Sequence, residues 1–183
     1  MSEEGTRSLL NSLHNREPAQ FLAENVALLP RGRVLDVAMG CGRNAIYLAK
    51  LGFEVEGVDL AAEAIRCALA SAEEAGVAIR AVVADLEGDY HITPGTYDVI
   101  ICFDYLQRSL MPQIKAGVRS AGMVVYETFI VDQTQFGRPR NPDHLLKHNE
   151  LLHMFGDFRC LRYREGIINE KRAVAGIVAE KWT

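Results

Sequence analysis

Residues 34–42 read VLDVAMGCG, a run that combines the pattern of a buried strand with one acid and two glycines. Gly40 and Gly42 would let the backbone turn sharply and come close to a ligand. The first amides of the following helix would offer hydrogen-bond donors to a carboxylate. Asp36 would face a cationic group of the same ligand. The stretch predicts a ligand-binding loop, with a plain tight turn and an arginine-paired acid as the alternative.

A second acid favours a nucleotide as the ligand. The stretch FEVEGVDL, residues 53–60, carries Asp59 at its last position but one, about 20 residues beyond the glycines. At this separation a carboxylate meets ribose hydroxyls in nucleotide-binding βαβ units. Gly40, Gly42 and Ala45 also satisfy the dinucleotide pattern G-x-G-x-x-A, so an NAD(P)-binding oxidoreductase stays an alternative.

Asp36 separates these two nucleotide classes. A pyrophosphate gains nothing from an acid on the binding strand, whereas a nucleoside that carries an amino acid has an ammonium group to pair with it. ADLEGDY, residues 84–90, then places Asp85 and Leu86 where an adenine would lie. S-adenosylmethionine (SAM) has all three parts, namely a zwitterionic methionyl group, a ribose and an adenine.

Strand-like and helix-like stretches alternate along the chain and would position these residues. The strand patterns are 34–38, 53–60, 78–85, 97–103 and 123–131, and the helix patterns are 43–52, 61–76, 107–117 and 141–156. Residues 158–166 and 173–181 form a final pair of strands around the polar INEKR. This order predicts a Rossmann-like three-layer sandwich, whose mostly parallel seven-stranded sheet ends in an antiparallel hairpin strand.

The composition limits the classes of protein. With 183 residues, of which 49% are apolar, we expect one domain over 1–183, with an N-terminal helical cover at 1–31 and the core at 32–183. A net charge of −4 offers no basic field for nucleic acid. The scattered cysteines, the lack of a long apolar run and the lack of a leader pattern predict a cytoplasmic protein without a membrane partner. His144 and His148 are spaced i, i+4, but the sequence shows no third ligand for a metal ion.

At these motifs the sequence resembles the class I SAM-dependent methyltransferases, over nearly the whole chain. The family's D-x-G-x-G-x-G motif has Ala38 at its first glycine, a mild departure because alanine is also small. CGRNAIYLAKLGFEVEGVDL, residues 41–60, is similar to the tellurite-resistance methyltransferase subgroup. The hairpin connection EGIINEKRA has no histidine, so the resemblance does not supply the identity of the acceptor.

The resemblance implies methyl transfer from SAM, with S-adenosylhomocysteine as the product. It assigns Asp36 and the glycine loop to the methionyl part, Asp59 to the ribose, and Asp85 with Leu86 to the adenine. The predicted cofactor-binding residues are Asp36, Ala38, Gly40, Gly42, Arg43, Asn44, Asp59, Leu60, Asp85, Leu86 and Phe103.

The acceptor is expected beyond the fourth and fifth strands, near Phe103–Tyr105 and Glu127–Phe129. Asp104, Tyr105 and Glu127 are the candidate catalytic residues, since an alcohol or amine acceptor needs a group to take its proton. A soft or anionic acceptor, such as a thiol or a chalcogen oxyanion, needs little such help. Arg138 and Arg140 flank a proline and suggest an anion site for the substrate, with a solvated loop as the alternative. A SAM or nucleoside sensor without turnover is the remaining functional alternative.

Overall fold

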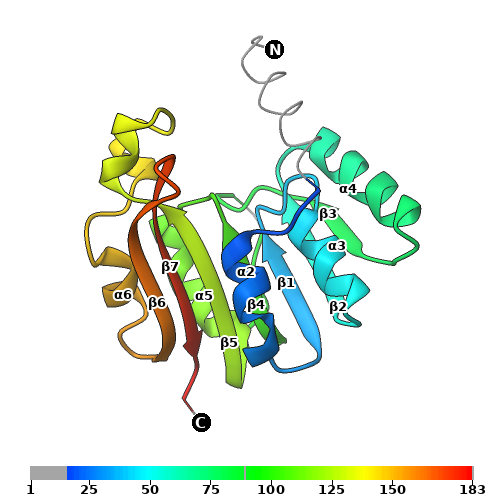
Figure 1. Cartoon of the computed structure of the whole chain (residues 1–183). Coiled ribbons are helices and arrows are strands. Elements are labelled where there is room, and N and C mark those ends of the chain that lie inside the picture. Colours follow the sequence, from blue (N-terminus) through cyan, green and yellow to red (C-terminus); the bar gives the residue numbers. More distant parts are fainter. Residues whose placement is uncertain (1–15, 89, 183) are drawn as a thin grey trace.

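A computed structural model describes residues 16–88 and 90–182 of the chain (Figure 1). One sheet of seven strands forms its centre, in the order β3-β2-β1-β4-β5-β7-β6. The strands are β1 (Arg33–Val37), β2 (Glu54–Asp59), β3 (Arg80–Val83), β4 (Tyr97–Phe103), β5 (Val118–Phe129), β6 (Arg159–Ile168) and β7 (Arg172–Glu180). β7 runs antiparallel to both of its neighbours, and the remaining pairs are parallel. The predicted mostly parallel sheet with one antiparallel hairpin strand is confirmed.

Helices cover both faces of this sheet (Figure 1). The described helices are α2 (Gln20–Asn25), α3 (Arg43–Lys50), α4 (Ala62–Glu74), α5 (Met111–Gly117) and α6 (Glu150–Met154), with 3-10 turns η1 (Val26–Leu28), η2 (Arg108–Leu110), η3 (Val131–Gln135) and η4 (Pro142–His144). α2, α3 and α4 bury apolar residues in one core, and α5 and α6 bury theirs in another. This is the three-layer arrangement that the alternating pattern predicts.

β4 lies between the two cores. All of its residues are buried, and they alternate between the faces, as the period of two in a strand requires. Val99 and Ile101 pack with α2, α3 and α4, whereas Ile100 and Cys102 pack with α5 and α6. A strand buried on both faces is largely apolar, which explains the apolar run VIICF after Asp98.

The strand order reverses between β1 and β4, because the chain runs from β1 out to β3 and then returns to the centre. Ligands of open α/β sheets bind at such a reversal, outside the carboxyl ends of the strands. The loop after β1 and the residues after β4 meet at this point. The fold therefore places the predicted cofactor loop and the predicted acceptor residues beside the same crevice.

One predicted helix is largely absent. The pattern at 141–156 predicts a continuous helix, but the structure has the short turn η4, an extended stretch and the short helix α6. At the end of β5, the Leu146 carbonyl accepts a backbone hydrogen bond from the Val131 amide, and the Leu146 amide donates one to the Phe129 carbonyl. This bridge holds Leu145 and Leu146 extended, and a turn with Asn149 at φ +61° separates them from α6.

Candidate active site

The loop between β1 and α3 turns through three left-handed residues, Ala38 at φ +55°, Gly40 at φ +55° and Gly42 at φ +77°. Glycine adopts this conformation without steric cost, whereas an L side chain costs roughly 1–2 kcal/mol. Ala38 therefore departs from the family motif in backbone energy as well as in size. A Cβ on Gly40 would meet no heavy atom within 4 Å, so the loop leaves open space on this side.

Asp59 fastens this loop to the end of β2. Its Oδ2 accepts a 2.8 Å hydrogen bond from the Gly40 amide, and its Oδ1 accepts one of 2.9 Å from the Ala61 amide. An ionised carboxylate has about four acceptor positions, so both oxygens keep capacity for a further donor. The structure thus brings together the two features that the sequence links only by spacing.

Asp36 lies buried beneath the start of α3, with 2% of its surface exposed. Its Oδ2 has no hydrogen-bond partner among residues 16–88 and 90–182. Burial raises the pKa of this carboxyl to about 8, against the opposing effects of Arg43 and the Ala45 amide. A buried acceptor without a donor costs free energy, so the site favours a ligand that brings a donor or a positive charge.

Two more of the predicted cofactor residues form hydrogen bonds between the start of α3 and the segments next to it. The side-chain oxygen of Asn44, which is buried, accepts a 2.8 Å hydrogen bond from the Ala19 amide and so ties the segment before α2 to α3. Arg43 donates a 3.0 Å hydrogen bond to Asp104 at the end of β4. These side chains connect the glycine loop with its neighbours on two sides.

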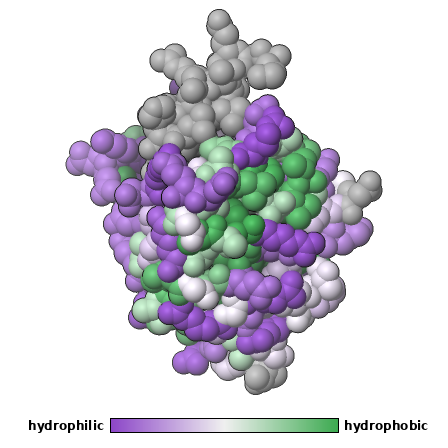
Figure 2. Space-filling view, turned by 90° about the vertical axis from the view of Figure 1, so that its right-hand side faces the viewer, coloured by the Kyte–Doolittle hydropathy of each residue, from purple (hydrophilic) through white to green (hydrophobic). Residues whose placement is uncertain are grey.

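The ends of β2 and β3 present apolar surface next to this loop. The Ala84 amide donates a 3.0 Å hydrogen bond to the Asp59 carbonyl, so the two strand ends lie together. Leu60 is 66% exposed and Val83 51% exposed. Figure 2 shows apolar surface on the side of the molecule that carries α4 and β3. Such surface suits a flat heterocycle. Asp85 follows on an exposed turn, and Leu86 is buried.

β4 and β5 end side by side, with Phe103 opposite Glu127 in the register. Asp104 follows β4 at φ +59° and forms ion pairs with Arg43, at 3.0 Å, and with Arg172. Both arginines therefore converge on one carboxylate at the tip of β4.

Glu127 is buried on β5 and is paired with Arg164 of β6. Arg164 donates to one oxygen, Oε2, from Nε at 2.9 Å and from Nη2 at 2.6 Å. Burial raises the pKa of Glu127, although Arg164 opposes the shift. Gly176 leaves room for the pair, since a Cβ there would lie 3.2 Å from Oε2 of Glu127.

Tyr105, the third catalytic candidate, is half-buried. Burial, together with the charges of nearby acids, raises its pKa to about 12. Its phenol therefore keeps its proton at neutral pH and can donate a hydrogen bond. Its backbone carbonyl accepts a 2.9 Å hydrogen bond from Tyr126, which fixes the chain after β4.

A cavity of about 270 Å³ opens beside these carboxylates. It lies between the segment before α2, the start of α3 and the hairpin of β6 and β7. Its lining is Glu17, Pro18, Ala19, Gln20, Arg43, Glu127, Arg164, Ile168, Asn169, Lys171, Arg172 and Val174. Four of these residues are cations and two are acids. We call this cavity the basic pocket.

Sequence reasoning did not identify Arg164, Lys171 or Arg172 as site residues. They lie on the terminal hairpin, far along the chain from the glycine loop. The detectable signal is the polar connection INEKR between two strands, because a hairpin after β5 returns to the crevice edge. The Nε of Arg172 is buried and has no hydrogen-bond partner in the described part of the chain.

Arg138 and Arg140, predicted to bind the substrate, lie on an exposed loop after η3 and are not in the lining of the basic pocket. The buried Gln133 holds this loop to β7. Its amide donates a 3.1 Å hydrogen bond to the Arg138 carbonyl, and its Oε1 accepts one of 2.9 Å from the Ala173 amide. The loop is thus fastened to the hairpin that carries Arg172.

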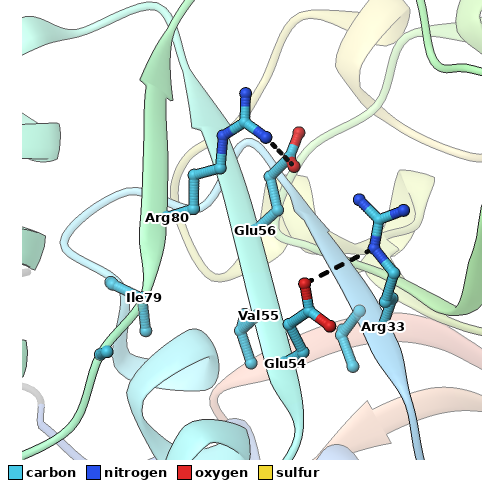
Figure 3. A pocket seen from close by; sticks show the side chains of 8 residues that line it. Arg33, Glu54, Val55, Glu56, Ile79 and Arg80 are labelled. Atoms are coloured by element: carbon cyan, nitrogen blue, oxygen red, sulfur yellow. Dashed lines mark ion pairs between the residues drawn. The ribbon is translucent and has the colours of Figure 1, made fainter.

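A second hollow, of about 320 Å³, lies at the opposite edge of the sheet, at the starts of β1, β2 and β3. Figure 3 shows its charged side chains paired with one another, Arg33 with Glu54 at 3.8 Å and Arg80 with Glu56 at 3.5 Å. It is separate from the glycine loop.

No group of three or more His, Cys, Asp or Glu side chains within 16–88 and 90–182 is placed to hold a metal ion. The described helices include none long and apolar enough to cross a membrane.

A family model described as a methyltransferase domain matches residues 34–125, from β1 into β5. The ubiquinone biosynthesis O-methyltransferase of Pectobacterium carotovorum subsp. carotovorum is 34% identical over 103 residues, which cover 55% of this chain and 43% of that protein. The chain thus spans about half the length of the curated relatives that it matches.

Among solved structures, TehB from Haemophilus influenzae has a TM-score of 0.74 at 22% identity, covering 87% of this chain and 61% of TehB. The [4+2]-cyclase SpnF also has a TM-score of 0.74, at 15% identity, with 97% of this chain and 92% of SpnF covered. At these identities the likeness concerns the fold. The matched residues 34–125 include the glycine loop and Asp59, and the hairpin with Arg164 and Arg172 lies beyond them.

Proposed function

Because this chain belongs to the methyltransferase domain family, we propose that it binds SAM at the loop after β1 and transfers the methyl group to a small acceptor that carries negative charge. The family implies SAM as the cofactor. The observation that carries the proposal is that an acidic site and a basic pocket lie beside the same crevice. A buried, unpartnered acid lies under the glycine loop, and several guanidinium groups line the pocket beside it.

The residues at the carboxyl ends of β1, β2 and β3 fit SAM. The unpartnered Oδ2 of Asp36 suits the methionyl ammonium, which would supply the missing donor and favour the ionised carboxylate. Asp59 keeps acceptor capacity on both oxygens for the ribose hydroxyls. Leu60 and the end of β3 offer apolar surface for the adenine. Each part of the cofactor thus has a chemically matched partner in the chain.

Bound SAM supplies a methyl group on a sulfonium, and the acceptor displaces the sulfur in line. The tasks left to the chain are alignment of the acceptor and exclusion of water. Residues 17–20 line one wall of the basic pocket, and the hairpin of β6 and β7 lines another. We propose that residues 1–183 form one methyltransferase domain and that 1–31 cover the site. Residues 1–15 of this cover lie outside the described residues.

The charges of the basic pocket favour an anionic acceptor. Arg43 and Arg172 meet at Asp104, and Arg164 meets Glu127, so each of these cations faces a carboxylate. Lys171 adds a fourth cation to the lining. An anion that enters the pocket would interact with these cations together with Asp104 and Glu127. A thiolate or a chalcogen oxyanion would enter already ionised and would need no base.

A phenolic acceptor is the second candidate, because the curated relatives are named O-methyltransferases. Such an acceptor must lose a proton. Glu127 would take it, since it is buried, its pKa is raised, and both Arg164 hydrogen bonds go to Oε2 and leave Oε1 to accept. Tyr105 would serve as a hydrogen-bond donor.

Calorimetric titration with SAM, S-adenosylhomocysteine and NAD(P) tests the cofactor. We expect the first two to bind and the third to fail. Binding of NAD(P) alone would contradict the proposal. A screen of thiols, chalcogen oxyanions and phenols with methyl-labelled SAM then tests turnover, and it separates an enzyme from a sensor that binds SAM without reacting.

A further inference from the structure

Two thiols meet where the glycine loop packs against α4. Cys41 lies between Gly40 and Gly42, Cys67 lies on α4, and both are partly buried. A side-chain interaction with Cys41 contributes to the raised pKa of Cys67, so the two thiols are neighbours. The backbones also pack closely at this place, since a Cβ on Gly42 would lie 2.9 Å from the Cβ of Ala68 and 3.5 Å from its Cα. The contact therefore joins loop to helix and is not confined to the tips of two side chains.

We propose that Cys41 and Cys67 form a redox-sensitive pair, which a low-molecular-weight disulfide oxidises to an intramolecular disulfide that links the glycine loop to α4. The site takes its oxidant from solution, by thiol–disulfide exchange. Its effect on SAM rests on the proposed function, whereas formation of the bond does not.

The exchange proceeds in two steps. The Cys41 thiolate attacks one sulfur of the small disulfide, forms a mixed disulfide and expels one thiolate. The Cys67 sulfur then attacks Cys41 of the mixed disulfide, forms the Cys41–Cys67 bond and expels the second thiolate. The two protons of the cysteines pass to the two released thiolates, so two protein thiols are oxidised and one small disulfide is reduced.

The surroundings of Cys67 assign the order of these steps. Burial, together with the neighbouring Cys41 thiol, raises the pKa of Cys67 to about 11. The thiolate is the attacking species, and Cys67 is therefore the slower nucleophile toward an oxidant in solution. Attack on a sulfur already held beside it is the step for which Cys67 is placed.

The new bond would change the shape of the loop. A disulfide holds its two Cβ atoms about 3.5–4.5 Å apart, closer than two separate thiols require. The loop has little freedom to follow, because Gly40 is bonded to Asp59 at 2.8 Å and Gly42 already rests on Ala68. Oxidation should therefore displace the loop amides from their positions and weaken SAM binding at least about tenfold.

The other cysteines provide internal controls. Cys160 is exposed on β6, and Cys102 is buried within β4. Cys160 will react with small disulfides, but it lies far along the sheet from the glycine loop. Cys160→Ser therefore removes a reactive thiol without touching the pair, and Cys67→Ser removes the resolving thiol.

The test incubates the full chain with glutathione disulfide and maps disulfides by peptide mass spectrometry, in parallel with SAM titration before and after reduction with dithiothreitol. We expect a Cys41–Cys67 cross-link in wild type and in Cys160→Ser, and only a mixed disulfide in Cys67→Ser. We also expect the oxidised wild type to bind SAM at least about tenfold more weakly and to recover on reduction.

A persistent mixed disulfide on Cys41 in wild type, or cross-links elsewhere, would overturn the inference. A Cys41–Cys67 bond with unchanged SAM affinity would overturn its effect on the loop. Failure of the reduced protein to bind SAM would refute the proposed function, while the mass-spectrometric map would still judge the thiol pair.

Discussion

The Gly40 amide donates a 2.8 Å hydrogen bond to Oδ2 of Asp59, which joins the loop after β1 to the end of β2. One carboxylate therefore shapes the loop and, in the proposed complex, also holds the ribose. This double role means that Asp59 variants change both the loop and the affinity for SAM.

Asp59→Ala should weaken SAM binding by about 1.5–3 kcal/mol, the range for hydrogen bonds to a charged group, or roughly 10- to 150-fold. It should also lower the thermal midpoint, because the Gly40 and Ala61 amides lose their acceptor. Calorimetry and thermal unfolding measure the two effects. Asp157→Asn, an exposed acid paired with Lys115, is the control and should leave SAM affinity unchanged. Equal affinity in the Asp59 variant and wild type would remove Asp59 from the site.

Gly40→Val and Gly95→Val form a matched pair. Both glycines have positive φ, +55° and +61°, and neither would place a Cβ within 4 Å of another atom. Each variant should lose stability through backbone strain, on the order of 1–2 kcal/mol. The Gly40 variant alone should also lose SAM binding, because Gly95 precedes β4 at the opposite edge of the sheet. Comparable SAM affinity in the two variants would show that the ligand does not approach Gly40.

Asp36 predicts a pH dependence of stability. Its pKa is raised to about 8 in the native state, whereas an unfolded aspartate has a pKa of about 3.9. Between these values the native state binds more protons than the unfolded state, so the free energy of unfolding should fall as pH rises from about 4 to about 8. Asp36→Asn should flatten this part of the profile in denaturant titrations across that range. A profile that matches wild type would contradict the buried, protonated carboxyl.

SAM binding should release a proton for the same reason. At a pH near 7 the free protein holds the Asp36 proton, and pairing with the methionyl ammonium ionises the carboxyl. Calorimetry in buffers of different ionisation enthalpy should show release of nearly one proton per SAM, and of much less in Asp36→Asn. Proton uptake on binding would argue against the pairing.

Arg172→Gln should raise the KM for an anionic acceptor at least about tenfold, equivalent to about 1.4 kcal/mol, and leave SAM affinity nearly unchanged. The KM for a neutral acceptor of similar size should change little.

The double variant Arg138→Ala with Arg140→Ala gives the same test for the exposed loop after η3. If the loop binds the acceptor, that double variant should raise KM for the anion as well and reduce the salt dependence of activity. Equal losses on both acceptors would mark either set of arginines as structural.

The alternating pattern was sufficient to predict the sheet, because buried parallel strands require apolar runs such as VIICF and their connections must cross over as helices. The glycine loop and Asp59 were also predictable, since their spacing reflects one βαβ unit. The segment 141–156 was not, because Leu145 and Leu146 fit a helical face equally well. A tertiary bridge to the end of β5 decides its structure.

The acceptor side was less accessible to sequence reasoning for a related reason. Glu127 was predicted, but its partner Arg164 comes from β6, which reaches it across β7 opposite Gly176. No local pattern connects those positions. The pairing of Glu127 with Arg164 depends on the order of three strands and on the absence of a side chain at Gly176. It can therefore be recognised only in the folded chain.

The most direct test of methyl transfer is the formation of S-adenosylhomocysteine from SAM by the full chain, measured by mass spectrometry with each class of acceptor in turn. We expect S-adenosylhomocysteine and methylated product in equal amounts with at least one thiol or chalcogen oxyanion, and loss of both in Asp59→Ala. Tight SAM binding without S-adenosylhomocysteine above the acceptor-free background, for thiols, oxyanions and phenols alike, would contradict the assignment as an enzyme.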